Sequence, residues 1–330
     1  MKIGLVLAVA MAVATAPQPV AAESLKLVAD IPLTGPTGRF DYERIDSVAR
    51  RLYISHMGPG AVVVFDLAAR REIARLPGFP GATGIIAVPA LHRVFVSVTG
   101  HWWNAVTGGG ELAAIDTSTL KTAWRVPAGR FPDGIAYVPA ANRLFVSDER
   151  GEQELVFDAR TGRQITAIPL DGEAGMSAFD PSAGRVLVNV QTRNEIAAID
   201  PATARIERRI ALPPVCRNNH GLLIDGPRAF VACDESANLL VVDLAGGRTL
   251  ETVSVGEAPD VLTLDAARDR LFVASESGVV SVFDVKPEKI EKLWEGMAGD
   301  NAHSIVADPQ SGLVYLPLRD LNGLRIMELR

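Results

Sequence analysis

Carboxylates and imidazoles recur at matched positions along this chain, and together they have the chemistry to bind a metal ion or a polar ligand. Each position stands just before or at the start of one apolar segment in a repeated pattern. The matched positions are Asp41, Thr83, Asp133, Gly175, His220, Asp260 and His303. Imidazole nitrogens and carboxylate oxygens are common protein ligands of zinc, copper and manganese. A fold that gathers these positions would therefore create an acidic site that contains histidine.

The unit that positions these residues has four short apolar segments and is clearest in residues 131–170. Its segments IAYV, RLFVS, ELVF and QITAI are bounded by turn residues, which predicts four antiparallel strands joined by tight turns. The third segment of each copy ends in an acid, at intervals of 41 to 50 residues. These acids are Asp66, Asp116, Asp158, Asp200, Asp243, Asp284 and Glu328.

Seven such copies predict a ring. A four-stranded unit that cannot bury both faces alone must pack between neighbours. We therefore predict an all-β fold, a seven-bladed β-propeller with four-stranded blades, as a single domain over residues 23–330. The last copy ends one strand short at Arg330, while Leu25–Leu33 has the composition of a strand without a blade. We expect this N-terminal strand to join the last blade and close the ring, and the matched positions to surround one channel mouth.

The repeats resemble the YVTN-type, surface-layer-type family of seven-bladed propellers. The resemblance rests on PDGIA, then RLFVS, then a hydrophobic run ending in Asp158, then the turn sequence Ala-Arg-Thr-Gly-Arg. It extends over nearly all of the chain after residue 22. It implies the propeller fold but no particular reaction, because one fold can carry many activities.

Three interpretations of the matched residues stay open. The acids can cap their own turns by accepting a backbone N–H two residues on, although this does not account for the histidines. A small polar ligand can be held by side chains of the set Asp41, Asp133, Asn219, His220, Asp260 and His303. A divalent metal can be held by His220, Asp260, His303 and Asp41, although the chain has no close ligand pair such as His-x-x-x-His.

The second copy carries an insertion, His101–Gly110, between its second and third segments. We expect His101, Trp102 and Trp103 on the same face as the matched positions. The tryptophans either form a lid or stacking platform over the channel mouth or cover the edge of a neighbouring blade. His56 occupies the corresponding place in the first copy, so we expect it on the same rim.

The chain contains two cysteines, Cys216 and Cys233. In an oxidising compartment we expect them to form a disulfide, which would stabilise the fold by about 3 kcal/mol for a loop of this length. The bridge would hold the segment carrying Asn219 and His220. The alternative is a pair of thiols that serves a metal or a redox reaction.

Residues 1–22 differ in composition from the rest. Lys2 is their only charge, an apolar run extends from Ile3 to Ala16, and small residues end the segment. This pattern predicts a cleaved signal peptide and a mature chain in the periplasm or outside the cell. A transmembrane anchor is the rival interpretation, but the run is too short and prolines follow it. No other stretch approaches membrane length.

The charge balance argues against nucleic acid as a partner. The formal net charge is −6, and removal of Lys2 with the signal peptide makes it −7. An acidic protein repels phosphate backbones and anionic lipid. The densest basic cluster, Arg205, Arg208 and Arg209, is typical of a solvated strand.

The sequence favours binding over catalysis. It contains no Gly-x-Ser-x-Gly, His-Glu-x-x-His, phosphate-binding loop or Cys-x-x-Cys-His motif. We therefore expect an exported, monomeric propeller that binds a small polar ligand or an envelope protein at the channel mouth, with no chemistry of its own and no certain cofactor. The alternative is a metal-dependent hydrolase resembling lactonases, in which the His/Asp ring and a metal-bound water open a cyclic ester.

Overall fold

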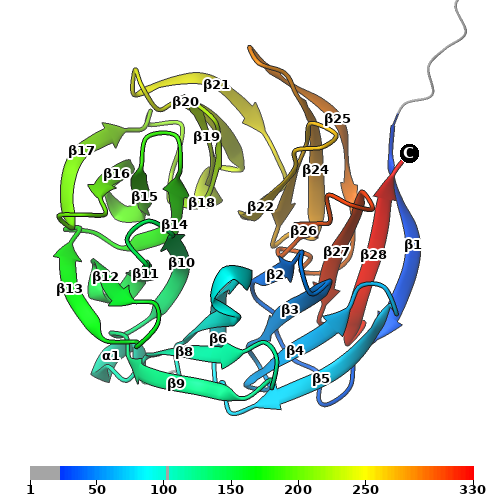
Figure 1. The fold of residues 1–330 in the computed structure, drawn as a ribbon. Helices are drawn as coiled ribbons and strands as arrows, with labels where there is room; N and C mark the ends of the chain where they lie inside the picture. Colours follow the sequence, from blue (N-terminus) through cyan, green and yellow to red (C-terminus); the bar gives the residue numbers. More distant parts are fainter. Residues whose placement is uncertain (1–22, 102–103) are drawn as a thin grey trace, which may run out of the picture.

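The computed structural model describes residues 23–101 and 104–330. In this part of the chain seven four-stranded antiparallel sheets are arranged as the blades of a ring (Figure 1). The fold is a seven-bladed β-propeller, as predicted. The predicted signal peptide, residues 1–22, lies outside the described residues, as do Trp102 and Trp103. Within the described part of the chain, no helix has the length and apolar character needed to cross a membrane.

The first four blades follow one another in sequence. Blade one contains β2 (Glu43–Asp46), β3 (Arg51–His56), β4 (Ala61–Asp66) and β5 (Arg71–Pro77). Blade two contains β6 (Ala82–Val88), β7 (Arg93–Val98), β8 (Glu111–Asp116) and β9 (Thr122–Pro127), with the short helix α1 (Asn104–Thr107) in its insertion. Blade three contains β10 (Pro132–Val138), β11 (Arg143–Asp148), β12 (Gln153–Asp158) and β13 (Gln164–Pro169). Blade four contains β14 (Ala174–Asp180), β15 (Arg185–Val190), β16 (Glu195–Asp200) and β17 (Arg205–Ala211).

The last three blades complete the circle. Blade five contains β18 (Asn219–Asp225), β19 (Arg228–Cys233), β20 (Asn238–Asp243) and β21 (Arg248–Ser254). Blade six contains β22 (Pro259–Asp265), β23 (Arg270–Ser275), β24 (Val279–Val285) and β25 (Ile290–Met297). Blade seven contains β26 (Val306–Ala307), β27 (Leu313–Leu318), β28 (Gly323–Leu329) and β1 (Leu25–Pro32).

The N-terminal strand closes the ring, as predicted. β1 pairs antiparallel with β28, from Leu25 opposite Leu329 to Pro32 opposite Gly323, and the blue and red strands lie side by side in Figure 1. Arg325 of β28 holds Asp30 of β1 in a two-point ion pair, with distances of 2.8 and 2.7 Å. The first and last strands are therefore fastened by backbone and side-chain bonds.

The acids that end the third strands form the tight turns into the outer strands. Asp158 Oδ1 accepts the N–H groups of Arg160 and Thr161 at 3.0 and 2.8 Å. Asp116 Oδ1 accepts those of Ser118 and Thr119 in the same way. A carboxylate that binds backbone N–H groups two and three residues ahead fixes such a turn, which explains the acid that recurs in each copy.

The core lies between adjacent blades. Phe95 of β7 packs with Leu144 and Phe157, which joins blade two to blade three. Phe272 of β23 packs with Val314 of β27, which joins blade six to blade seven. All five side chains are buried. Because each blade buries its faces only against its neighbours, the closed ring is a condition of stability.

Candidate functional site

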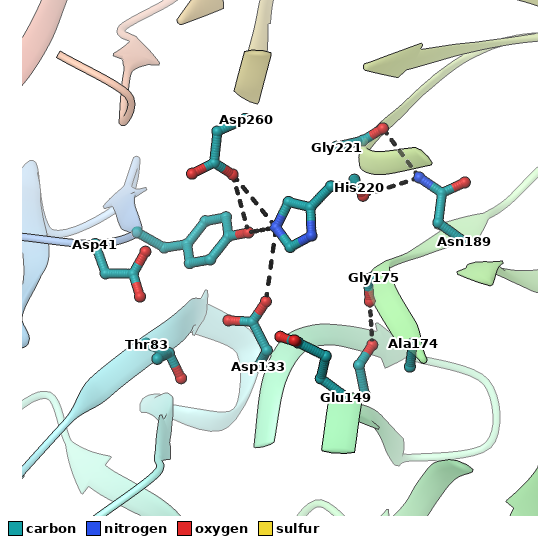
Figure 2. A network of polar contacts seen from close by, with 12 residues as sticks. Asp41, Thr83, Asp133, Glu149, Ala174, Gly175, Asn189, His220, Gly221 and Asp260 are labelled. Atoms are coloured by element: carbon teal, nitrogen blue, oxygen red, sulfur yellow. Dashed lines mark hydrogen bonds and ion pairs between the residues drawn. The ribbon is translucent and has the colours of Figure 1, made fainter. Parts of the chain in front are cut away.

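A β-bulge turns the matched residues toward the channel. In five blades, two residues of the innermost strand lie opposite one residue of the second strand, and the register shifts there. These bulges begin at Thr83, Asp133, Gly175, His220 and Asp260. A bulge bends a strand and changes the direction of its side chain. Six of the matched positions, namely Asp41 and the five at which a bulge begins, lie around one space (Figure 2).

Hydrogen bonds between blades hold these bulges in place. Ser97 Oγ donates to the Asp133 carbonyl at 2.7 Å. Asn189 Nδ2 donates to the carbonyls of His220 and Gly221 at 2.9 and 3.0 Å (Figure 2). A Cβ atom on Gly221 would lie 2.1 Å from the Asp260 carbonyl oxygen, so this close approach of blades five and six requires glycine. The backbone that carries His220 and Asp260 is therefore tightly constrained.

A cavity of about 490 Å³ occupies the channel mouth. It is lined by residues that enter the innermost strands and by residues that follow the second strands. Six carboxylic side chains line it: Asp41, Asp133, Glu149, Asp234, Asp260 and Glu276. The basic side chains in its lining are Arg39 and His220. Its volume suits a small ligand or one large side chain, and acidic side chains outnumber basic ones in its lining.

His220 is the centre of the polar network (Figure 2). Its Nε2 lies 2.9 Å from the Tyr42 hydroxyl and 3.3 Å from Asp260 Oδ1. The Asp133 carboxylate is 3.9 Å from the same nitrogen. The Tyr42 hydroxyl also lies 3.5 Å from Asp260 Oδ1. Two carboxylates and a phenol thus face one edge of the imidazole.

The other edge of the His220 ring faces an amide oxygen. His220 Nδ1 lies 3.1 Å from Gln191 Oε1, and Gln191 Nε2 donates to the Ala174 carbonyl at 3.2 Å. A carbonyl only accepts, so the bond to Ala174 fixes the amide with its oxygen toward the histidine. Both ring nitrogens therefore face acceptors, which indicates that His220 is an imidazolium.

The electrostatics agree with this geometry. Burial opposes a charge on His220, but the hydrogen bond and charge of Asp260, with the charges of Asp133 and Glu149, raise the pKa of His220 to about 10. Burial acts to raise the pKa of Asp260, yet the contact with His220 prevails and lowers it. His220 and Asp260 therefore form a buried ion pair.

The other carboxylic side chains of the cavity have fewer contacts that stabilise a negative charge. Burial, together with the charge of Asp41, raises the pKa of Asp133 well above its usual value. Burial likewise raises the pKa of Glu149 and of Asp234. Asn218 Nδ2 donates to Asp234 at 3.1 Å, whereas no backbone N–H bonds the Asp133 carboxylate among the described residues. The N–H groups of the turn before Asp133 are instead accepted by Asp148, so Asp133 is not the cap of this turn.

His303 lies at the boundary between blades seven and one. Its Nδ1 is 3.0 Å from the Asn301 carbonyl, and its Nε2 is 3.8 Å from Asp41 Oδ1. Burial disfavours a charge on His303, but Asp41 and Asp260 raise its pKa. On the cavity side, Arg39 forms a 2.7 Å ion pair with Glu276.

The disulfide between Cys216 and Cys233 is formed, as predicted. It links the segment before β18 to the end of β19. The turns it joins carry Asn218 and Asp234, which both line the cavity. The bridge therefore supports the part of the rim that precedes His220.

Two predicted ligand residues point elsewhere. His56 is fully buried, and its ring stacks on Phe40 with centroids 3.9 Å apart while Arg75 bonds its Nδ1. It therefore packs inside blade one and does not join the rim. Asn219 is also fully buried, and its Nδ2 donates to Asn189 and to the Glu195 carbonyl. It supports the neighbouring blade and does not face the cavity.

The insertion of blade two borders the mouth. His101 lines a second cavity, of about 640 Å³, that shares Arg39, Met57 and Phe131 with the first. This places the insertion on the predicted face. The lid proposed for Trp102 and Trp103 concerns residues outside the described part of the chain.

Sequence comparison missed a second ring of residues. Glu149, Gln191, Asp234 and Glu276 each stand six positions after the arginine that begins a second strand, and all four line the cavity. A count of six residues from each of these arginines would have identified them. Tyr42 could not be found by such a count, because it directly follows the matched residue Asp41 and does not itself occupy a matched position.

The arrangement suits recognition of a cation. Six carboxylates surround two basic groups, and one of those basic groups is already paired with Asp260. The cavity thus offers several oxygen acceptors and little compensating charge, which favours an ammonium, guanidinium or metal ion.

Solved structures that share the fold include the following three. The chain matches "Kuenenia stuttgartiensis Hydrazine Synthase" with a TM-score of 0.76 and 13% identity, over 90% of this chain and 97% of that one. It matches "Crystal structure of RRP9 WD40 repeats" with a TM-score of 0.75 and 9% identity, over 93% and 100%. It matches "Crystal Structure of Mitotic Checkpoint Complex" with a TM-score of 0.78 and 10% identity, over 98% of each chain. At these identities the likeness concerns the fold alone.

Comparison of sequences identifies a family. No curated protein matches the chain. Residues 108–316, however, match the profile of a family of propeller repeats. This match includes more than half of the sequence and extends from the insertion of blade two to blade seven. The chain therefore belongs to the family described as outer membrane protein assembly factor BamB.

Proposed function

We propose that this protein is a binding propeller that captures a positively charged group at the channel mouth. The group is a primary ammonium or a guanidinium, and the observation that carries the proposal is the excess of six carboxylic side chains over two basic ones around the cavity. Such a group would pair with carboxylates that now lack a compensating charge.

The family supports a polypeptide as the source of this group. Its description names outer membrane protein assembly, which favours a lysine or arginine side chain of an envelope protein as the natural ligand. A small polar amine has the same chemistry and is the second source. The cavity volume of about 490 Å³ accommodates either.

The proposal includes export. The composition of residues 1–22 favours a signal peptide and therefore a periplasmic or secreted protein, which we propose is monomeric. N-terminal sequencing of protein recovered from the periplasm should begin at Glu23. The narrower resemblance to the YVTN-type family stays a prediction.

A metal-dependent lactonase-like hydrolase is less well supported. The metal set predicted from the sequence includes His220, but both ring nitrogens of His220 already face hydrogen-bond acceptors. A nitrogen that carries a proton has no lone pair for a metal. We therefore favour binding.

A thermal-shift panel tests the proposal. Amines, guanidines and lysine- or arginine-containing peptides should raise the melting temperature, whereas matched neutral and carboxylate compounds should not. The variant Asp133→Asn with Glu149→Gln should lose this response, while Glu207→Gln on outer strand β17 should keep it. Stabilisation by the carboxylates, or an equal response in the double variant, would contradict the proposal. Comparison of the peptides with the small amines shows which of the two is the better source of the bound cation.

A further inference from the structure

His303 has an unusual set of contacts for a buried side chain. It is 1% exposed, and its Nε2 has no hydrogen-bond partner among the described residues. Its Nδ1 lies 3.0 Å from the Asn301 carbonyl and must donate to it, because a carbonyl only accepts. This bond fixes the ring and leaves Nε2 for another interaction. A histidine that binds a metal through one nitrogen typically donates its other N–H to a carbonyl or carboxylate.

Carboxylates lie close to the His303 ring. A ring nitrogen of His303 and one oxygen each of Asp260 and Glu276 lie within 4.8 Å of one another. Because Nδ1 is engaged by Asn301, Nε2 is the nitrogen available to this group. Asp41 Oδ1 lies 3.8 Å from Nε2, which is too long for a hydrogen bond. The atoms are close enough for small rotations to bring them to the 2.0–2.2 Å bond lengths of a transition metal.

The backbone around His303 is already ordered. The Val261 N–H donates to the His303 carbonyl at 3.3 Å, which joins blade six to the segment before β26. The Ala302 N–H donates to the Gly299 carbonyl, and Ser304 Oγ donates to the buried Glu43. The imidazole is thus presented by a segment fixed on both sides.

A metal would compete with the pair of His220 and Asp260 and with the ion pair between Arg39 and Glu276. Arg39 and Glu276 are both 39% exposed, and solvent screens exposed ion pairs, which therefore contribute little to stability. Glu276 can therefore turn toward a metal at low cost, or keep one oxygen on Arg39 and offer the other.

We propose that the wall formed by blades six, seven and one is a binding site for a divalent transition-metal ion. Its ligands are His303 Nε2, Asp260 and Glu276, with Asp41 beside them. The imidazole favours manganese or zinc over calcium and magnesium, which prefer oxygen ligands alone. The site replaces the His220 of the sequence-based metal set with Glu276. It goes beyond the proposed function, because it needs no organic cation.

Calorimetric titration of the chelator-treated full chain with Mn²⁺ tests this site, with electron paramagnetic resonance as a second readout. We expect one Mn²⁺ per chain, and Zn²⁺ to compete for the same site. Glu276→Gln should weaken binding by about tenfold or more, and His303→Gln should abolish it. Glu207→Gln removes a carboxylate from outer strand β17 and should bind Mn²⁺ like the wild type.

Three results would overturn the proposal: binding of much less than one Mn²⁺ per chain, equal affinity in Glu276→Gln and the wild type, or tighter binding of Ca²⁺ than of Mn²⁺ and Zn²⁺. If circular dichroism shows that His303→Gln does not fold, Glu276→Gln decides, because its side chain lies on the exposed rim. If the wild type does not bind Mn²⁺ but still responds to amines, the metal site is refuted and the proposed function is not.

Discussion

Glu154 provides a sharp test of the physical reasoning, because its hydrogen bonds specify its protonation state. The side chain is fully buried between blades three and four. Ser147 Oγ donates to the Gly175 carbonyl at 2.6 Å and lies 2.8 Å from Ser177 Oγ, which in turn lies 2.8 Å from Glu154 Oε1. Each hydroxyl has one proton to donate. Since Ser147 uses its proton on the carbonyl, Ser177 must donate to Ser147, and Glu154 must donate to Ser177 as a neutral acid.

The contribution of the protonated Glu154 side chain to the free energy of unfolding depends on pH. Burial raises the pKa of Glu154 from 4.5 to about 8. The unfolded chain loses the proton near pH 4.5 and the folded chain near pH 8. The contribution of Glu154 to stability is therefore full below pH 4.5 and falls as the pH rises toward 8. At pH 7 the loss is about 3 kcal/mol, at about 1.4 kcal/mol per pH unit.

Glu154→Gln should therefore stabilise the protein at neutral pH. The amide can donate to Ser177 as the acid does and does not ionise. Its second N–H stays unpaired, which costs about 1 kcal/mol, so the expected net gain at pH 7 is about 2 kcal/mol.

Urea unfolding of both proteins from pH 5 to pH 9 measures this difference. The gain should increase with pH up to about 8. Glu207→Gln, whose side chain is 42% exposed, should change stability by less than about 0.5 kcal/mol at any pH. A difference that does not vary with pH, or a variant less stable than the wild type at pH 8, would refute the assignment of a protonated Glu154.

Two further predictions concern the disulfide and the ion pair that stabilise the ring. Replacing both Cys216 and Cys233 by serine should lower the free energy of unfolding by about 3 kcal/mol, as measured by urea denaturation, and reduction of the wild type should reproduce the loss; identical midpoints for oxidised and reduced protein would contradict this. Asp30→Ala removes the two-point pair with Arg325 and should cost about 1 kcal/mol, whereas Asp320→Ala, which breaks an exposed pair with the adjacent Arg319, should cost less. Equal shifts for the two aspartates would show that the Asp30 pair does not fasten the N-terminal strand.

The fold could be predicted because the sequence pattern of one blade occurs seven times. Seven copies with an acid at the end of each third strand give the period of the blade, and the missing strand of the last copy indicates that Leu25–Leu33 closes the ring. The structure confirms both through the seven sheets and the pairing of β1 with β28. These features depend on local patterns that each copy repeats.

The site was only partly predictable. The matched positions identify Asp133, His220 and Asp260 because the bulge recurs at one place in the repeat. His56 was misplaced because its burial depends on Phe40, a contact outside the repeat pattern. The imidazolium of His220 could not be predicted, since it depends on Gln191, a residue of another blade.

The measurement that tests the central claim most directly is a calorimetric titration with Nα-acetyl-lysine methylamide and with its Nε-acetylated form. Acetylation removes the positive charge and leaves most of the side chain unchanged. We predict that the wild type binds the charged probe, that acetylation weakens binding by about tenfold or more, and that Glu149→Gln with Asp234→Asn weakens binding of the charged probe to a similar extent. Equal affinity for the two probes, or no loss in the double variant, would contradict the claim that the acidic cavity at the channel mouth recognises a cation.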